Sequence, residues 1–267
     1  MPSYVVVGAS KGLGYQFLRT ISEQDSSNIV IGLVRTPEDV QKKIEADGLK
    51  NVHIIHGDLD SHVSLNAAAK KTAELTGGAL DYLIVNGVYS PVHVYLKTVE
   101  DFIDKEDVFL TELKQTMQTN VGGTLFAFNA FLPLVLKSNI RRVAAISSMA
   151  ALRDYVYDGE DALGIHYATS KAAMNILVAK FAARYKHEGV RFVSLSPGSV
   201  KTHPEIPEEF MELVRTPLRR FDPEFKGQLS PAQSVEMCLQ VMDELKQEQS
   251  GEFLSHHGNK TLWLVER

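Results

Sequence analysis

Cysteine is almost absent from this chain of 267 residues, which contains a single one, Cys238. One cysteine cannot form a disulfide within the chain, and it leaves no cysteine–histidine cluster of the kind that binds a metal ion. Cys238 lies among apolar residues at helical spacing, which predicts a buried thiol. We therefore expect a reducing, cytoplasmic environment and no metal centre.

Long hydrophobic runs and basic patches are missing as well. The longest apolar runs, such as 131–136, fall far short of the roughly 20 residues that span a bilayer. The net charge is −5 and the pI is about 6.0, without the basic patch that nucleic acid requires. The first predicted strand begins at Tyr4, which leaves no room for a targeting peptide. We expect neither a membrane nor a nucleic-acid partner.

What is present is a repeated alternation of short β-branched runs and longer helical patterns. Strands are predicted at 4–7, 29–34, 52–56, 82–85, 143–146, 192–195 and 253–254. Helices are predicted near 13–23, 36–47, 63–75, 110–136, 166–187 and 231–247. The strands are continuous apolar runs, which is typical of parallel strands buried on both faces. The expected fold is α/β, with one domain over 1–267: a doubly wound (Rossmann-type) sheet of about seven mostly parallel strands with helices on both faces.

Two segments interrupt this alternation, and both follow the carboxyl end of a strand, where open α/β sheets bind ligands. They are 89–109 and 201–229. Within the second, 207–214 is amphipathic and is interpreted as a short lid helix, or else as a surface loop with a few apolar anchors. Aromatic and apolar residues predict a hydrophobic pocket wall, and these are Tyr89, Val92, Tyr95, Met149, Tyr155 and Tyr157.

A glycine-rich turn follows the first strand and opens the first helix. Its spacing is G-x-x-x-G-x-G, in which the glycines let the backbone approach a pyrophosphate at the helix N-terminus. An ordinary glycine-rich turn is the alternative. The residues expected to contact a nucleotide here are Gly8, Ser10, Lys11, Gly12, Leu13 and Gly14.

The end of the second strand indicates which nucleotide is bound. NAD enzymes usually carry an acid there for the ribose 2′-hydroxyl, but this chain has no acid and places Arg35 just after the strand. Arginine pairs with a phosphate in bidentate fashion, and Lys11 adds a second cation. NADP(H) is therefore favoured, unless both residues are simply solvated surface charges.

Tyr167 and Lys171 lie four residues apart in a predicted helix and share one face. A fixed cation lowers the pKa of a nearby phenol, so the tyrosine can exchange a proton with a carbonyl or carbinol oxygen. Such a pair is common by chance, and two exposed helical residues are the alternative.

Taken together, these motifs resemble the short-chain dehydrogenase/reductase family, and in particular its NADP-preferring carbonyl reductases, from Ser3 to about Gly258. The markers occur in the family's order along the chain. They are the loop 8–14, Asp58-Leu59, Asn86, Asn120, Ser147-Ser148, Tyr167 with Lys171, and Pro197-Gly198.

The resemblance implies a role for each marker. Tyr167 would be the general acid in reduction, Lys171 would lower its pKa and bind the nicotinamide ribose, and Ser148 would stabilise the substrate oxygen. Asn120 would hold a water that links Lys171 to solvent. The remaining residues would bind the cofactor: Asp58 and Leu59 at the adenine, Asn86 and Gly87 at the adenosine ribose, and Pro197, Gly198, Val200 and Thr202 at the carboxamide.

Several features depart from the family pattern. Tyr167 follows Ser148 by 19 positions, a spacing longer than usual for the family, and the insertion 153–164 is expected to protrude beside the pocket. If the insertion displaced Ser148, the serine assignment would fail. The usual Asn-Asn-Ala-Gly after the fourth strand is replaced by 85–88, Val-Asn-Gly-Val.

The sequence thus predicts an NADP(H)-dependent reductase of an apolar or aromatic ketone or aldehyde. Two alternatives are an isomerase or dehydratase of the same fold and a nucleotide-binding sensor without turnover. The resemblance also implies a homodimer or homotetramer through the helices at 110–136 and 166–187.

Overall fold

The fold is a single seven-stranded parallel sheet, seen in a computed structural model that describes residues 1–202 and 208–264. The strand order is β3-β2-β1-β4-β5-β6-β7. The strands are β1 Ser3–Val7, β2 Ile29–Val34, β3 Val52–His56, β4 Tyr82–Val85, β5 Arg142–Ile146, β6 Arg191–Ser196 and β7 Phe253–Ser255. The predicted doubly wound α/β sheet is confirmed, and its order reverses between β1 and β4. Such a reversal opens the crevice in which open α/β sheets bind ligands.

Alternate strand residues supply two separate hydrophobic cores, one on each face of the sheet. Tyr4 and Val6 face a core shared with α1, α2 and α10, whereas Val5 and Val7 face a core shared with α3, α6 and α8. The helices on the first face are α1 Gly12–Gln24, α2 Pro37–Ala46 and α10 Pro231–Glu244. Those on the second face are α3 His62–Thr76, α6 Gly123–Val135 and α8 Ile165–Arg184. Burial on both faces explains why the strands read as unbroken apolar runs.

The single helix predicted at 110–136 is wrong, because the chain forms two helices joined by a π-helical turn. Helix α5 covers Glu106–Met117, the π turn covers Gln118–Gly122, and α6 follows at once. The Cβ position of Gly123 lies 2.7 Å from the Leu59 side chain, so a larger residue would not fit there. π turns are rare and occur frequently at functional sites, and this one contains Asn120.

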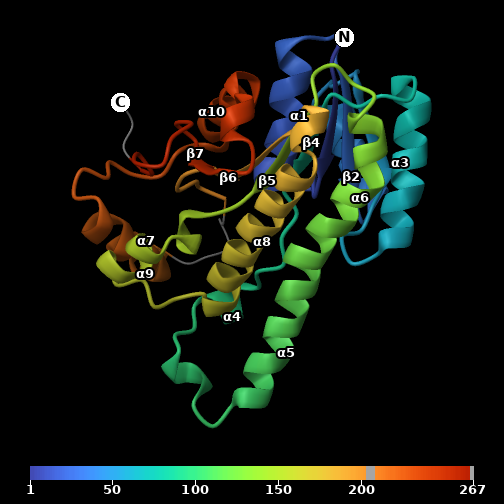
Figure 1. Cartoon of the computed structure of the whole chain (residues 1–267). Helices are drawn as coiled ribbons and strands as arrows, with labels where there is room; N and C mark the ends of the chain where they lie inside the picture. The colour runs from blue at the N-terminus through green and yellow to red at the C-terminus, as the bar shows by residue number, and fades with distance from the viewer. Residues whose placement is uncertain (203–207, 265–267) are drawn as a thin grey trace.

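The two segments that interrupt the alternation contain short helices. The first includes α4 Val92–Tyr95 and a 3-10 turn at Glu100–Phe102. The second includes α9 Glu208–Phe221, so the predicted lid helix begins outside the described residues at 207 and extends further than expected. The insertion forms α7 Arg153–Asp158, which packs beside α9, and other 3-10 turns lie at Met149–Ala151, Lys186–Glu188 and Gln247–Gln249 (Figure 1).

The described residues contain neither a membrane-spanning helix nor a metal-ligand cluster. None of their helices has both the length and the apolar character needed to cross a bilayer. Within the same residues, no three His, Cys, Asp or Glu side chains are grouped as metal ligands.

The turn after β1 and the end of β4 approach each other so closely that only glycine fits. Gly8 has φ +81°, and a Cβ built on it would lie 2.3 Å from the Gly87 Cα atom. A Cβ on Gly14 would lie 2.1 Å from the Gly8 carbonyl oxygen. Backbone atoms cannot move aside as a flexible side chain can, so this contact fixes the crevice at the reversal point.

We predict that Gly8→Ala destabilises the protein much more than Gly77→Ala. Gly77 ends α3 with φ +68° but has open space around its Cβ position, so alanine there adds only backbone strain of about 1–2 kcal/mol. Gly8→Ala adds a backbone clash and should cost more than about 3 kcal/mol. Urea unfolding of the two variants checks this prediction, and equal losses would contradict it.

Candidate active site

The N-terminus of α1 has no side-chain cap, which is also true of α2, α5, α7 and α8 but not of α3 and α10. Ser61 caps α3 and Ser230 caps α10 within a capping box, but Lys11 makes no capping hydrogen bond at α1. The first N–H groups of a helix need a partner, and the helix dipole favours an anion there. The uncapped end, beside the glycine contact with Gly87, therefore fits the pyrophosphate of a dinucleotide.

The other predicted cofactor residues on this side are arranged around the same turn. Asn86 donates a 3.0 Å hydrogen bond from Nδ2 to the Gly8 carbonyl oxygen, which ties the end of β4 to the glycine turn. Leu59 is buried against Gly87. Asp58 accepts a 3.1 Å hydrogen bond from the Asp60 backbone N–H through its carboxylate.

The residues predicted to select the nucleotide lie at the surface on this side. Ser10, Lys11 and Arg35 are all exposed, and Leu13 is half-buried. Within 1–202 and 208–264, no ion pair is found for Lys11 or Arg35. Both cations are thus accessible to a phosphate group.

The turn after β6 faces the glycine turn from the other side of the crevice. Ser234 of α10 donates a 2.7 Å hydrogen bond to the Pro197 carbonyl oxygen, and Gly198 has φ +79° beside the His256 ring. The Thr202 methyl lies 3.9 Å from the Cβ position of Gly12. Val200 forms a β-bridge with Leu229 that holds this turn in place.

Ser148, Tyr167 and Lys171 come together at the carboxyl end of β5. The Lys171 Nζ atom donates a 2.6 Å hydrogen bond to the carbonyl oxygen of Ile146, the last residue of the strand. Ser148 follows two residues later, and its hydroxyl lies close enough to the Tyr167 phenol to lower the pKa of that group. The insertion therefore does not displace Ser148, whose side chain also accepts a 3.2 Å bond from Ala150 N–H.

The expectation that Lys171 lowers the pKa of Tyr167 differs from what the structure shows. Burial raises the pKa of the Tyr167 phenol, and the neighbouring Ser148 hydroxyl opposes that rise. Burial also lowers the pKa of Lys171 to about 7, so its positive charge is largely lost above neutral pH. The Nζ atom points to Ile146 and lies 5.7 Å from the Tyr167 ring centre, where it is a weak cation for the phenol.

Asn120 connects the π turn to two other segments of the site. Its Oδ1 accepts a 2.7 Å hydrogen bond from Tyr89 N–H, and its Nδ2 donates to the Tyr89 carbonyl at 3.1 Å and to Ser170 Oγ at 2.9 Å. Ser170 Oγ donates in turn to the Tyr167 carbonyl at 2.8 Å. Both amide hydrogens are used, so its predicted role in holding a water stays a prediction.

Two positioning residues escaped the sequence analysis. Ser170 accepts a hydrogen bond from Asn120 and donates one to the Tyr167 carbonyl, and it thereby links the π turn to the turn of α8 that carries Tyr167. Asn175 accepts a 2.7 Å hydrogen bond from Ser147 Oγ. Asn175 follows Lys171 by four residues, so both share a helix face toward the end of β5. This spacing of four residues from Lys171 is the one feature of the sequence that could have identified Asn175.

The predicted aromatic wall is partly present. Tyr89 and Tyr95 line a small crevice next to Tyr167, and the Tyr95 ring meets the Tyr167 ring edge-on at 5.7 Å. Met149 and Tyr155 are buried, with Tyr155 packed against Phe221 of α9. Tyr157 is a correction, because it is 71% exposed on the surface of α7.

The fold and these residues define a dinucleotide-binding α/β protein with a Ser-Tyr-Lys site at the carboxyl edge of its sheet. The sequence model of the family described as short chain dehydrogenase matches residues 3–209. This chain therefore belongs to the short-chain dehydrogenase/reductase family of oxidoreductases.

Similar proteins support this membership over the whole chain. The chain is 37% identical to the short chain dehydrogenase virK of Hypocrea virens, covering 99% of this chain and 100% of the relative. It is 38% identical to the short-chain dehydrogenase/reductase iacC of Pestalotiopsis fici, with the same coverage. The solved structure of NADPH-bound carbonyl reductase from chicken fatty liver has the same fold, with a TM-score of 0.80 at 24% identity, covering 98% and 94% of the two chains.

We predict that burial of Lys171 makes the stability of the protein rise with pH above neutrality. The pKa of Lys171 is about 7 in the folded chain and 10.5 when the side chain is not buried. Between these two pH values the unfolded chain therefore binds more protons than the folded chain. The contribution of neutral Lys171 to folding stability is fully present above the unfolded pKa of 10.5, and it is lost as the pH falls toward 7. Relative to Lys171→Met, the free energy of unfolding should gain at most about 1.4 kcal/mol per pH unit between pH 7 and 10. Urea unfolding of both proteins checks this, and parallel pH curves would contradict it.

Proposed function

We propose that the protein is an NADP(H)-dependent reductase that converts a ketone or aldehyde to an alcohol. The observation that carries this proposal is the meeting of Ser148, Tyr167 and Lys171 at the end of β5, on the edge where α1 presents its uncapped N-terminus. Family membership supports oxidoreductase chemistry in general.

The raised pKa of Tyr167 suits the direction of reduction. A phenol that stays protonated at neutral pH can act as a general acid toward the carbonyl oxygen. Ser148 would donate a hydrogen bond to the same oxygen as negative charge develops there. The bound nicotinamide would supply the hydride. Lys171, with a pKa of about 7, can exist in either protonation state near the working pH.

The preference for NADP(H) rests on Lys11 and Arg35. Both are exposed at the glycine-turn side, and a guanidinium pairs well with a 2′-phosphate. The chicken carbonyl reductase with a similar fold was solved with NADPH bound, which agrees with this preference. Titration with NADPH and NADH, followed by a panel of ketones, aldehydes and quinones, tests cofactor and reaction together.

We also propose a homodimer or homotetramer in a cytoplasmic setting. Large apolar side chains are exposed on the helices named for this role: Val108 and Leu110 on α5 and Ile176 on α8. A second copy of the chain would cover these surfaces.

Tyr167→Phe should lower kcat by about 10²- to 10⁴-fold, because it removes the only proton that the phenol can transfer. Nucleotide binding should persist. Tyr157→Phe is the matched control, since that tyrosine is 71% exposed and does not line the crevice beside Tyr167. Steady-state kinetics on a substrate found in the panel check this. Full activity in Tyr167→Phe would instead point to other chemistry, such as isomerisation or dehydration.

Arg35→Asp should weaken NADPH binding by about 10- to 100-fold, because it replaces a charge-assisted bond of about 1.5–3 kcal/mol with a repulsion. NADH lacks the 2′-phosphate and serves as the internal control, so its affinity should hardly change. Fluorescence titration measures both affinities. Equal losses for the two nucleotides would rule out a phosphate contact at Arg35.

A further inference from the structure

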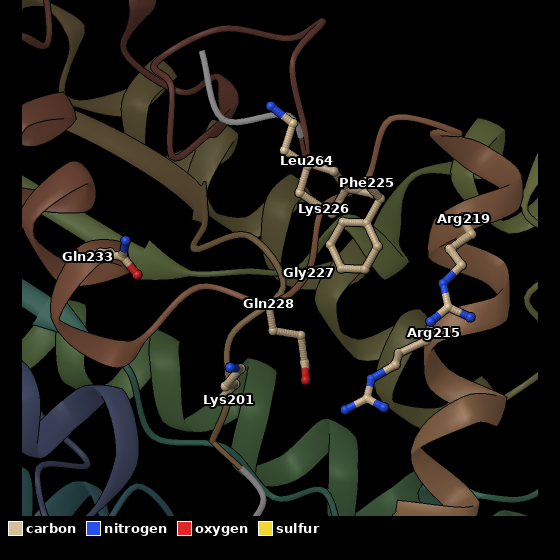
Figure 2. Close-up of a pocket in the computed structure, with 9 residues that line it drawn as sticks. All are labelled: Lys201, Arg215, Arg219, Phe225, Lys226, Gly227, Gln228, Gln233 and Leu264. Carbon is tan, nitrogen blue, oxygen red and sulfur yellow. The ribbon is translucent and has the colours of Figure 1, made fainter.

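A cavity of about 400 Å³ lies between α9 and the segment that leads into α10. This volume falls within the range of small-molecule sites, about 300–1,000 Å³. It is distinct from the narrow crevice beside Tyr167. In Figure 2, Arg215 and Arg219 extend from α9 toward the segment that carries Gln228, with Lys201 below it.

The lining of this cavity is strongly basic, although the chain as a whole has a net charge of −5. Among the described lining residues, four carry a positive charge and none is acidic: Lys201, Arg215, Arg219 and Lys226. Like charges gathered around one cavity repel each other and raise the positive potential inside it, an effect that the Glu212 carboxylate paired with Arg219 offsets in part. An anion that enters the cavity relieves this repulsion.

Apolar and neutral groups complete the cavity. The ring of Phe225 forms one wall, and Leu264 contributes a second apolar surface. Gln228 adds an amide, which can hydrogen-bond to a ligand oxygen. This combination fits a molecule with an aromatic or aliphatic body and an oxyanion at one end.

The ion pair that Arg219 of α9 forms leaves this side chain able to accept such a ligand. Arg219 forms an ion pair with Glu212, but the two side chains are 53% and 55% exposed. Exposed ion pairs contribute little to stability, so a ligand carboxylate can compete with Glu212. A guanidinium binds a carboxylate through two parallel hydrogen bonds.

The position of Lys201 joins this cavity to the cofactor side of the site. Lys201 lies between Val200 and Thr202, both predicted to contact the nicotinamide end of the cofactor. Its backbone N–H donates a 3.0 Å hydrogen bond to Leu229, and Thr202 lies against Gly12. An anion held by Lys201 is therefore attached to the same turn that is predicted to position the cofactor.

We infer that the carbonyl substrate carries a carboxylate or similar oxyanion, which binds in the cavity between α9 and the segment 225–228. This inference rests on the proposed reductase function and refines it, because the sequence alone favoured an uncharged apolar substrate. The same cations could instead receive the diphosphate of the cofactor, and the experiment separates these two sources of negative charge.

The test compares 4-acetylphenyl alkanoic acids of increasing chain length with their methyl esters, using the intact protein and NADPH. We expect kcat/KM for the best acid to exceed that of its ester at least tenfold. The acid-to-ester ratio should fall at least tenfold in Arg219→Gln and in Lys201→Gln, mainly through KM. Arg220→Gln is the matched control, since Arg220 neighbours Arg219, is 50% exposed and pairs with Glu160 without lining the cavity.

Three results would overturn the inference. One is an equal kcat/KM for acids and esters in the unchanged protein. This result would contradict the anion site but not the proposed reductase function, because the esters would still be reduced. Another is an unchanged ratio in both variants. A third is at least tenfold weaker NADPH binding in the variants with no change in the ratio, which would assign the cations to the cofactor diphosphate.

A binding measurement decides the matter if no carbonyl in the series is reduced. Trp263 is the only tryptophan of the chain, packs against Phe253 and precedes Leu264 of the cavity. Titration with 4-phenylbutyrate should change its fluorescence in the unchanged protein and not in Arg219→Gln, whereas 4-phenylbutanamide should have little effect. Such a result would support the anion site even as the reductase proposal failed, and equal responses to the acid and the amide would overturn it.

Discussion

The hydrogen bond from the Lys171 Nζ atom to the Ile146 carbonyl is the contact on which the site depends. It joins α8 to the last residue of β5 at 2.6 Å, and Ser147 repeats the connection through Asn175 one helical turn further along. A buried amine would be costly in its charged form, and its pKa falls to about 7 for that reason. The helix is thereby held at one position along the strand, and the Tyr167 phenol meets Ser148.

The π turn at Asn120 shows how local helix regularity is given up for the geometry of the site. An unbroken helix from α5 into α6 would keep the usual i to i−4 hydrogen bonds, but it would turn the Asn120 side chain to a different angle. In the π turn the side chain reaches both the Tyr89 backbone and Ser170. The segment after β4, which forms one wall of the crevice, is thus fixed relative to the turn of α8 that carries Tyr167.

The sheet, the positions of its strands and the order of the family markers could be predicted from the sequence, because buried parallel strands leave a direct signature in composition. The break at Gln118–Gly122 could not, since apolar residues continue on both sides of it and the glycine pair at 122 and 123 fits several local structures. The direction of the Tyr167 pKa shift was also beyond the sequence. Helical spacing places Lys171 and Tyr167 on one face, but it does not say that the Nζ atom turns toward Ile146.

The insertion 153–164 and the segment after β6 pack against each other through helices α7 and α9. Tyr155 of α7 packs against Phe221 of α9, and a Cβ on Gly159 would lie 2.8 Å from the Pro217 carbonyl oxygen, so the two helices are closely fitted. Leu218 is buried in the cluster that also contains Met149, next to Ser148. The buried side of α9 is therefore anchored to the segment that carries Ser148, and Arg215 and Arg219 line the cavity. In the proposed reaction, a fixed helix can recognise charge at a constant distance from a substrate carbonyl, whereas ordering a mobile loop around the ligand would cost conformational entropy.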